Sequence, residues 1–391
     1  MSQLTREELT RYSRHLILPE VGLEGQQKIK DAKVLCVGTG GLGSPIALYL
    51  AAAGVGKLGI IDYDTVDETN LQRQIIHRTS DIDRPKVASA REKLEELNPF
   101  IKVVPIEILL NSTNALQVFK DYDVIVDGTD NFATRYLIND ACVLLGKPLI
   151  YGSIFRFEGQ ATVFNYQGGP CLRCLYPEPP PAGLVPTCSE GGVLGVLPGI
   201  IGCVQATETL KIILNGNTNS AAGGNAKNTL SSRLLLFDAW TMKFRELKLR
   251  KDTNCPICGE NPSIKKLIDY EEFCGLKKHS DEEPIESLDV HDLKRIMDNE
   301  PDTLQIIDIR EPHEIAMGAF PQSKYVPFGQ VVRRKDEFDP QKFNVFICKV
   351  GVRSEYAIKA LREAGFNGRL ANLKDGTNAW AKEIDETFAV Y

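Results

Sequence analysis

Two pairs of cysteines, each with the spacing Cys-x-x-Cys, place the strongest constraint on how this chain of 391 residues can fold. Cys171 and Cys174 form the first pair, and Cys255 and Cys258 form the second. Each pair offers two thiolates at a spacing that zinc sites use, and two pairs complete a closed tetrahedral site of the structural kind. A shared zinc ion would require the fold to bring the end of a domain back to its middle. Redox-active dithiols and ordinary core cysteines are the alternative interpretations.

Strand-like and helix-like segments alternate through the first part of the chain. We expect strands at residues 33–38, 58–62, 101–106, 124–127 and 149–152, and helices at 44–53, 86–97 and 131–145. This alternation predicts a mostly parallel α/β sheet with helices on both faces. Three later segments, 160–166, 233–237 and 243–249, lack intervening helices of crossover length, which indicates antiparallel strands that extend the same sheet.

A charged segment at residues 265–284 has the composition of a linker. A second α/β pattern begins beyond it. Its strands and its helix are expected at 304–309, 344–348 and 354–364. The sequence therefore predicts a first domain over residues 1–264 that holds both cysteine pairs, a linker over 265–284, and a smaller α/β domain over 285–391.

Charge and hydropathy exclude several classes of protein. The net charge of −6 argues against a nucleic-acid-binding protein, because phosphate binding favours an excess of basic residues. No apolar segment follows a basic start, so no export signal is expected. The apolar stretch 197–214 contains Gln205, Glu208 and Lys211, which indicates a buried helix and not a membrane span. Ten cysteines without an export signal indicate a reducing compartment, and we expect a cytoplasmic protein.

A glycine-rich loop lies between the first expected strand and the first expected helix. Its glycines are Gly38, Gly40, Gly41 and Gly43. Glycines permit a tight turn and a close approach of phosphate to the backbone, and the start of the following helix offers free N–H groups. Asp62 ends the next strand, where a carboxylate can accept hydrogen bonds from a ribose. The loop alone does not distinguish a dinucleotide from ATP, and a turn without a ligand is the simpler alternative.

The residues that follow favour ATP. Arg73 and Lys86 place two cations behind the loop, and transfer of an adenylyl group needs such cations because negative charge builds up on the leaving pyrophosphate. Asp130 follows another strand, where its carboxylate could hold Mg²⁺. Alternatively, Arg73 is a surface cation and Asp130 caps the helix that follows it.

Two further cysteines are candidate nucleophiles. Cys348 ends a strand and is followed by Lys-Val-Gly-Val-Arg-Ser, a loop that can wrap backbone N–H groups around the sulfur. We expect the helix N-terminus and Arg353 to add positive potential that stabilises a thiolate or a persulfide there. Cys188 follows a proline-dense segment and precedes Ser-Glu-Gly-Gly. It is either a nucleophile on a mobile crossover or a spectator, and Cys348 is otherwise a buried structural cysteine.

Several motifs together resemble a known family. They are Arg11-Tyr-Ser-Arg14-His-Leu-Ile-Leu-Pro, the Gly38–Gly43 loop, Asp62-Tyr-Asp64, Asn70-Leu-Gln-Arg73-Gln74, Lys86, Asp127-Gly-Thr-Asp-Asn131, Arg156-Phe-Glu-Gly-Gln160, the four paired cysteines, Cys188-Ser-Glu-Gly-Gly-Val-Leu-Gly195, Ile307-Asp-Ile-Arg-Glu-Pro-His-Glu314 and Cys348-Lys-Val-Gly-Val-Arg-Ser354. Over nearly its whole length the chain resembles two-domain adenylyltransferases and sulfurtransferases of the ubiquitin-activating superfamily, which serve molybdopterin-synthase and thiamin-thiazole sulfur pathways. The resemblance implies a Rossmann-like adenylation domain with a zinc knot, followed by a rhodanese domain.

The resemblance also implies roles for individual residues. ATP and Mg²⁺ would be bound by Gly38, Gly40, Gly41, Gly43, Asp62, Asp64, Asn70, Arg73, Gln74, Lys86, Asp130 and Asn131. Arg14 would reach the ATP of a second subunit, which implies a homodimer. Cys188 matches the position where relatives form a thioester or an acyl disulfide, and Cys348 matches the persulfide carrier.

Two departures from the family pattern stand out. Residues 215–228 look like an insertion. Leu373-Lys-Asp-Gly376 replaces the double glycine common in rhodaneses, and we expect it to alter packing without affecting the Cys348 loop.

The expected reaction follows from these roles. The C-terminal glycine of a small ubiquitin-like sulfur carrier with a Gly-Gly ending is adenylylated, and a Cys348 persulfide, charged by a cysteine desulfurase or by thiosulfate, then delivers sulfur to it. The receiving pathway is molybdenum cofactor synthesis, with thiamin, tRNA thiolation or cysteine synthesis as alternatives. A nicotinamide-dependent oxidoreductase and a non-catalytic carrier scaffold are the rival classes. The first leaves Arg73, Lys86 and Cys348 without a role.

Overall fold

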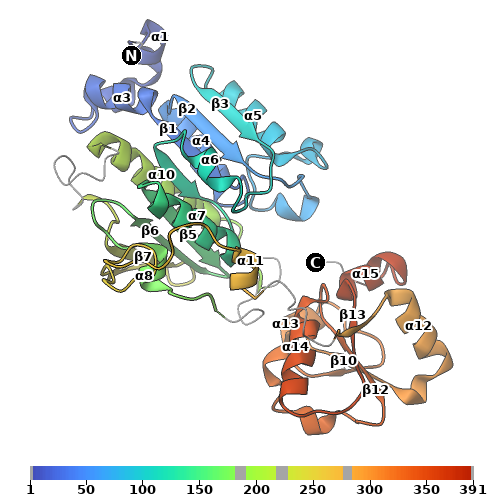
Figure 1. The fold of residues 1–391 in the computed structure, drawn as a ribbon. Helices are drawn as coiled ribbons and strands as arrows, with labels where there is room; N and C mark the ends of the chain where they lie inside the picture. Colours follow the sequence, from blue (N-terminus) through green and yellow to red (C-terminus); the bar gives the residue numbers. More distant parts are fainter. Residues whose placement is uncertain (1–2, 181–190, 217–227, 276–283, 389–391) are drawn as a thin grey trace. The chain divides into compact units, whose positions relative to one another are not determined.

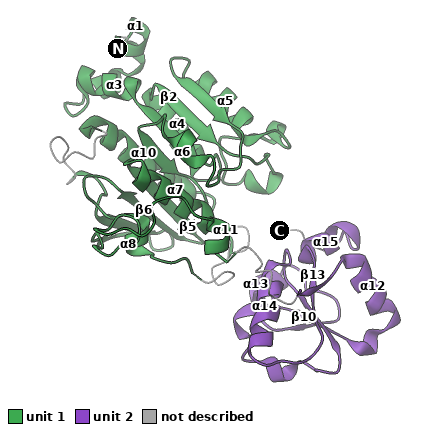
Figure 2. Ribbon diagram, viewed as in Figure 1, with its two compact units in different colours: residues 1–180, 186–276 green, residues 181–185, 277–391 purple. Residues whose placement is uncertain are grey.

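The computed structural model describes residues 3–180, 191–216, 228–275 and 284–388. They form two compact units, the first ending at Gly275 and the second beginning at Pro284 (Figure 2). Each unit has a sheet and hydrophobic clusters of its own.

The first unit is built on an eight-stranded sheet with the order β3-β2-β1-β4-β5-β6-β7-β8 (Figure 1). Its strands are β1 Lys33–Val37, β2 Lys57–Ile61, β3 Lys102–Ile106, β4 Val124–Asp127, β5 Leu149–Phe155, β6 Glu158–Phe164, β7 Arg233–Asp238 and β8 Lys243–Lys248. The first five are parallel, and β6, β7 and β8 are antiparallel to their neighbours. The predicted extension of a parallel sheet by antiparallel strands is therefore confirmed.

Helices cover both faces of this sheet because successive strand residues point to opposite faces. The helices are α1 Arg6–Arg11, α2 Ser13–Leu16, α3 Gly22–Asp31, α4 Gly43–Ala53, α5 Lys86–Leu97, α6 Ala115–Phe119, α7 Phe132–Leu144, α8 Leu172–Leu175, α10 Leu197–Asn215 and α11 Tyr270–Phe273. In β1, Val34 and Cys36 join the cluster with α4, α5 and α10, whereas Leu35 and Val37 join the cluster with α6 and α7.

Helix α10 contradicts the prediction that no helix of crossover length lies between the later strands. It lies between β6 and β7 in the chain, so a helix of crossover length does separate two strands that are nevertheless antiparallel. By length and composition α10 could cross a membrane, but 56% of its apolar window is buried inside the protein. It contacts α4, β5 and β6, as a core helix does.

The expected linker is shorter than its composition indicated. Within residues 265–284, α11 docks onto α7, and Tyr270 and Cys274 are buried in the cluster around α7. An apolar face carried by Tyr270 and Phe273 explains this docking, because burial of aromatic area outweighs the high local charge. The first unit therefore continues beyond residue 264, as far as Gly275 among the described residues.

The second unit contains a five-stranded parallel sheet with the order β11-β10-β12-β13-β9. Its strands are β9 Glu286–Leu288, β10 Leu304–Asp308, β11 Ser323–Tyr325, β12 Phe343–Ile347 and β13 Leu370–Leu373. Its helices are α12 Val290–Asn299, α13 Pro312–Ile315, α14 Val352–Glu363 and α15 Gly376–Glu383. One cluster packs beneath α12 and α15, and the other, which includes Cys348, packs beneath α14.

Candidate functional site

A pocket of about 300 Å³ lies at the carboxyl ends of β1, β2 and β4 in the first unit. The strand order reverses between β1 and β4, because the chain goes from β1 to β2 and β3 on one side before it returns to β4 on the other. Crevices at such reversals are where open parallel sheets bind ligands. Every predicted nucleotide-binding residue lines this pocket except Gly43.

The glycine loop approaches its surroundings too closely for larger residues. Gly38 has a φ of +91°, a conformation that favours glycine. A Cβ on Gly43 would lie 2.0 Å from the carbonyl oxygen of Gly38. Gly43 therefore closes the turn against the start of α4, and the other three glycines of the loop face the pocket.

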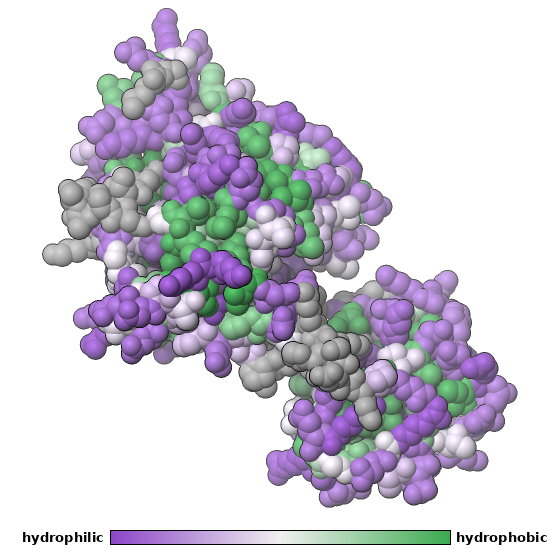
Figure 3. All heavy atoms as spheres, in the orientation of Figure 1, coloured by the Kyte–Doolittle hydropathy of each residue, from purple (hydrophilic) through white to green (hydrophobic). Residues whose placement is uncertain are grey.

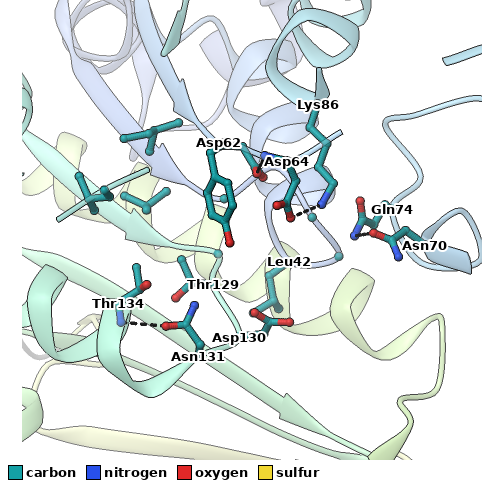
Figure 4. A pocket seen from close by; sticks show the side chains of 18 of the residues that line it. Leu42, Asp62, Asp64, Asn70, Gln74, Lys86, Thr129, Asp130, Asn131 and Thr134 are labelled. Atoms are coloured by element: carbon teal, nitrogen blue, oxygen red, sulfur yellow. Dashed lines mark hydrogen bonds and ion pairs between the residues drawn. The ribbon is translucent and has the colours of Figure 1, made fainter. Parts of the chain in front are cut away.

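Acidic and basic groups from the end of β2 and the start of α5 contact each other at one wall of the pocket (Figure 4). Lys86 is buried, and its Nζ lies 2.9 Å from Oδ2 of Asp64. Gln74 donates from Nε2 to Oδ1 of Asn70 at 2.9 Å. Such a set offers amide groups, a carboxylate and an ammonium group to a polar, anionic ligand.

Arg73 is half-buried at the same wall. Its guanidinium donates to the carbonyl of Thr69 at 3.2 Å, and its side chain lies beside Gly41. Arg73 therefore lines the pocket with a side chain that is partly exposed.

Asp130 and Asn131 face the pocket from the loop after β4 (Figure 4). Asn131, not Asp130, is the N-cap of α7, since its side-chain oxygen accepts from the amide of Thr134 at 2.9 Å. The capping alternative for Asp130 is thus wrong, and this exposed residue lines the pocket. A hard oxygen ligand at this place fits Mg²⁺.

The Asp130 loop is itself held by a buried carboxylate that sequence reasoning missed. Asp127 accepts from the amide and the hydroxyl of Thr129, at 2.8 and 2.6 Å. Burial raises the pKa of Asp127, and Arg135 lies 4.0 Å from its second oxygen. The Asp-x-Thr pattern after a strand is the signal of such an Asx turn.

Arg14 does not line the pocket of its own chain. It is exposed on α2, which packs on α3. Helix α3 leads into the amino end of β1, whereas the pocket lies at the carboxyl end of that strand.

The four paired cysteines come together at a separate place in the first unit. All four Sγ atoms lie within 4.8 Å of one another. The Sγ–Sγ distances are 3.9 Å for Cys171–Cys174, 3.5 Å for Cys171–Cys255 and 3.3 Å for Cys174–Cys258. Tetrahedral zinc with Zn–S bonds of about 2.3 Å places sulfurs roughly 3.8 Å apart, so the cluster fits this ion.

A buried ion pair anchors the cysteine cluster to the core. Arg173, between the first two cysteines, contacts Asp140 of α7 through Nε and Nη2 at 2.9 Å, and both side chains are inaccessible to solvent. Tyr270 of α11 donates to the same carboxylate at 2.8 Å. The guanidinium also lies 4.5 Å from the ring centre of Phe273, and this cation–π contact adds to the docking of α11.

Cys348 is buried at the end of β12 in the second unit, just before the loop that opens α14. The amide of Gly351, in a left-handed conformation with a φ of +85°, donates to Sγ at 3.1 Å. The hydroxyl of Ser354 lies 3.3 Å from Sγ and 2.6 Å from Oδ1 of Asn372. Ser354 has one hydroxyl hydrogen, and Oδ1 of Asn372 is its nearer acceptor, so the amide of Gly351 is the donor that these contacts assign to the sulfur.

Arg353 does not contribute the positive potential that the sequence suggested. Its guanidinium makes two hydrogen bonds to Glu314, at 2.8 and 2.7 Å, and both side chains are nearly buried. The carboxylate compensates the positive charge, so Arg353 ties the loop to α13 instead.

The turn that replaces the double glycine does contact the Cys348 loop, contrary to expectation. Asp375 and Gly376 are both left-handed, with φ of +58° and +60°. The amide of Thr377 donates to the carbonyl of Cys348 at 2.9 Å. A Cβ on Gly376 would lie 2.3 Å from that carbonyl oxygen, so the turn supports the loop directly.

Two sequence expectations lie outside the described residues. They concern Cys188 and most of the insertion at 215–228.

Comparisons with known proteins agree with this architecture. Residues 12–257 match the ThiF family, and residues 289–383 match the Rhodanese-like domain. An Aedes aegypti protein named adenylyltransferase and sulfurtransferase MOCS3 is 44% identical over 407 residues, which cover 100% of this chain and 91% of the relative. A Mycobacterium tuberculosis protein named probable adenylyltransferase/sulfurtransferase MoeZ is 44% identical over 404 residues, covering 100% and 97%.

Solved structures share the fold of the first unit. Escherichia coli MccB, crystallised with ATP, aligns with a TM-score of 0.53 at 20% identity, over 63% of this chain and 74% of MccB. The expected fold, a Rossmann-like α/β unit followed by a rhodanese unit, is confirmed. The chain therefore belongs to the ThiF family, among the adenylyltransferase and sulfurtransferase enzymes in which a rhodanese-like domain accompanies the ThiF domain.

Proposed function

We propose that this enzyme adenylylates the C-terminal glycine of a ubiquitin-like sulfur carrier with a Gly-Gly ending and then converts it to a thiocarboxylate. The observation that carries the proposal is the convergence of Arg73, Lys86 and Asp130 on one pocket at the strand-order reversal. A second unit with a cradled cysteine supplies the sulfur chemistry. The receiving pathway is molybdenum cofactor synthesis, and thiamin, tRNA thiolation and cysteine synthesis are the alternatives.

In the first step the carrier carboxylate attacks the α-phosphate of ATP, and pyrophosphate leaves. Arg73 and Lys86 stabilise the charge that develops on the leaving group. Asp130 is the residue that would hold Mg²⁺, which neutralises phosphate charge when bound. Asp62 and Asn70 orient the nucleotide, and the product is a carrier acyl-adenylate.

In the second step a persulfide on Cys348 attacks the acyl carbon and AMP leaves, which gives a disulfide between the carrier acyl sulfur and Cys348. A second thiolate, for which we propose Cys188, attacks the Cys348 sulfur. This releases the thiocarboxylate and leaves a Cys188–Cys348 disulfide, which cellular thiols reduce. A cysteine desulfurase or thiosulfate restores the persulfide.

Two surfaces support the proposed partners. Phe157 follows the strand that contributes Ile154 to the pocket, and it packs on Trp240 in the turn between β7 and β8. Beyond it Met242 and Phe244 are exposed, and we propose that the body of the carrier docks here. On the face drawn in Figure 3, hydrophobic residues also gather near the middle of the first unit, within a mainly hydrophilic surface.

Arg14 supports a homodimer. Next to it Ile17 is 70% exposed, and Tyr49 is 57% exposed beside an apolar hollow of about 310 Å³ between α4 and α10. We propose that a second copy of this chain covers this face and receives Arg14 in its own pocket. A cytoplasmic location and structural zinc on the four cysteines complete the proposal.

ATP–pyrophosphate exchange, measured with a diglycine-ended carrier, tests the function. Asp130→Ala should lower exchange by about 10²–10³-fold, because it removes charge stabilisation at the phosphates, and should leave thiosulfate-dependent sulfur transfer intact. Cys348→Ala should show the opposite pattern.

Absence of carrier-dependent exchange in the unmodified enzyme would contradict the proposal. Carrier binding without ATP turnover would favour the scaffold, and bound nicotinamide with hydride transfer would favour the oxidoreductase.

A further inference from the structure

The carbonyl of Thr39, at the centre of the glycine loop, is held from behind by His77. Nε2 of His77 lies 3.1 Å from this oxygen. Thr39 is fully buried and His77 is 6% exposed, so the contact is shielded from water. A hydrogen bond in such a place is costly to lose, because the group left behind has no solvent to replace its partner.

The neighbours of His77 determine which nitrogen carries the hydrogen. A carbonyl oxygen only accepts, so Nε2 must donate to Thr39. Nδ1 of the neutral ring is then an acceptor, and the hydroxyl of Ser89 lies 2.9 Å from it. Nζ of Lys93 donates to the same hydroxyl at 3.3 Å and is ion-paired with Asp81. Lys93, Ser89, His77 and Thr39 therefore form one connected chain of contacts, in which Ser89 also contacts the Asp81 carboxylate.

The ring is held in its neutral state. Burial lowers the pKa of His77, and the nearby charge of Lys86 acts in the same direction. Only the neutral ring can accept from Ser89 while it donates to Thr39.

Thr39, whose carbonyl accepts from His77, also contacts a residue that lines the pocket. Its amide and its hydroxyl both donate to Oδ2 of Asp62, at 2.8 and 3.0 Å. Oδ1 of Asp62 accepts from the amide of Asp64 at 3.0 Å. A single residue thus connects the buried imidazole to the Asp62 carboxylate, which lines the pocket.

We propose that His77 is a positioning residue for nucleotide binding, which fixes the glycine loop and Asp62 through Thr39 without touching the nucleotide itself. The inference rests on the proposed function in that the ligand is ATP. If His77 only packed in the core, loss of its Nε2–H donor would not affect nucleotide binding. A positioning role through Thr39 and a packing role can therefore be separated by experiment.

Two amide substitutions form a matched test. The side-chain nitrogen of His77→Gln can occupy the place of Nε2 and still donate to Thr39, whereas that of His77→Asn is one methylene too short. Calorimetric titration of the full-length protein with Mg²⁺ and ATP should show a Kd raised about tenfold or more for the Asn variant and within about threefold of the wild type for Gln. In pyrophosphate exchange the KM for ATP should rise while kcat stays nearly unchanged.

Thiosulfate-dependent sulfur transfer at Cys348 serves as the internal control, because the second unit has its own core. Equal Kd values for the Gln and Asn variants would overturn the inference, and so would a loss confined to kcat. If the Asn variant does not fold, Ser89→Ala takes its place. It removes the hydroxyl that contacts Nδ1 and should raise the Kd by more than the Gln substitution does, whereas an unchanged Kd would overturn the inference. Failure of the wild type to bind ATP would instead refute the proposed function.

Discussion

At the scale of single residues, the Cys348 loop depends on positions that contain no reactive group. Gly351 supplies the amide that points at the sulfur, and Gly376 lets a second turn lie against the loop backbone. Both contacts are made by uncharged backbone. The nearby cation, Arg353, is paired with Glu314. The backbone amide of Gly351 is therefore the main polar group that the loop directs at the sulfur.

Gly376→Ala should abolish this arrangement. Its Cβ would lie 2.3 Å from the carbonyl of Cys348 in a left-handed backbone, so the loop must move. We expect a loss of stability of about 2–4 kcal/mol in the second unit and a loss of thiosulfate-dependent sulfur transfer. Gly329→Ala is the matched control, because nothing lies within 4 Å of its added carbon. Urea unfolding and a cyanide assay of both variants check this, and equal activities would contradict it.

The residues of the site divide clearly into those that the sequence predicts and those that it does not. Glycines, acids and cations that follow strands could be placed at one sheet edge, since parallel strands end together. The contacts of His77 with Thr39 and of Arg173 with Asp140 join residues 38 and 33 positions apart. These contacts depend on how helices and loops pack in three dimensions, and no local sequence pattern predicts them. For the same reason the pairing of Arg353 with Glu314 was not foreseen.

At the scale of elements, α11 decides where the first unit ends. It is a single turn that docks through aromatic contacts and through Tyr270, whose hydroxyl meets the buried Asp140. Because Asp140 also binds Arg173, this one carboxylate connects α7, the cysteine cluster and the last helix before the second unit.

Tyr270→Phe should loosen this docking without dismantling the cysteine cluster. Loss of a hydrogen bond to a buried carboxylate costs about 1.5–3 kcal/mol, and we expect the first unit to lose that much stability in urea. Zinc content should stay unchanged. Tyr325→Phe provides the control, because among the described residues its buried hydroxyl has no hydrogen-bond partner, so its removal should be nearly neutral. Identical losses in the two variants would argue against the role of Tyr270.

Most elements could be predicted from hydrophobic periodicity. Helix α5 has the predicted bounds, Lys86–Leu97, and α4 ends at Ala53 with the predicted cap at Gly54, which is left-handed with a φ of +88°. The failures have physical causes. Helix α11 is four residues long, too short for a periodic pattern. The long α10 separates two antiparallel strands, a connection that the simple rule for crossovers does not anticipate.

At the scale of the whole molecule, chemistry is divided between two units with separate cores. The nucleotide pocket and the cysteine cluster belong to the first, and Cys348 belongs to the second. Activation of the carrier and storage of sulfur can therefore proceed independently, whereas delivery of sulfur to the carrier requires both units at once.

Cleavage of the connection should separate these steps. A protease site placed within residues 277–283 should, after cutting, leave carrier-dependent pyrophosphate exchange and thiosulfate-dependent sulfur transfer within about twofold of the intact protein. Thiocarboxylate formation on the carrier should fall by about 10²-fold or more at micromolar protein, because the effective concentration supplied by a short connection, in the millimolar range, is lost. Mass spectrometry of the carrier measures this. The uncut protein with the same inserted site is the control, and undiminished product after cutting would contradict the prediction.

The two halves of the cysteine cluster are synthesised at different times. Cys171 and Cys255 are 84 residues apart, so a ribosome adding about 5–20 residues per second needs about 4 to 17 seconds to pass from one to the other. During that interval the nascent chain holds only two of the four cysteines of the cluster. Chelation applied only while the protein is being translated should therefore trap more material than the same chelator applied to the finished enzyme.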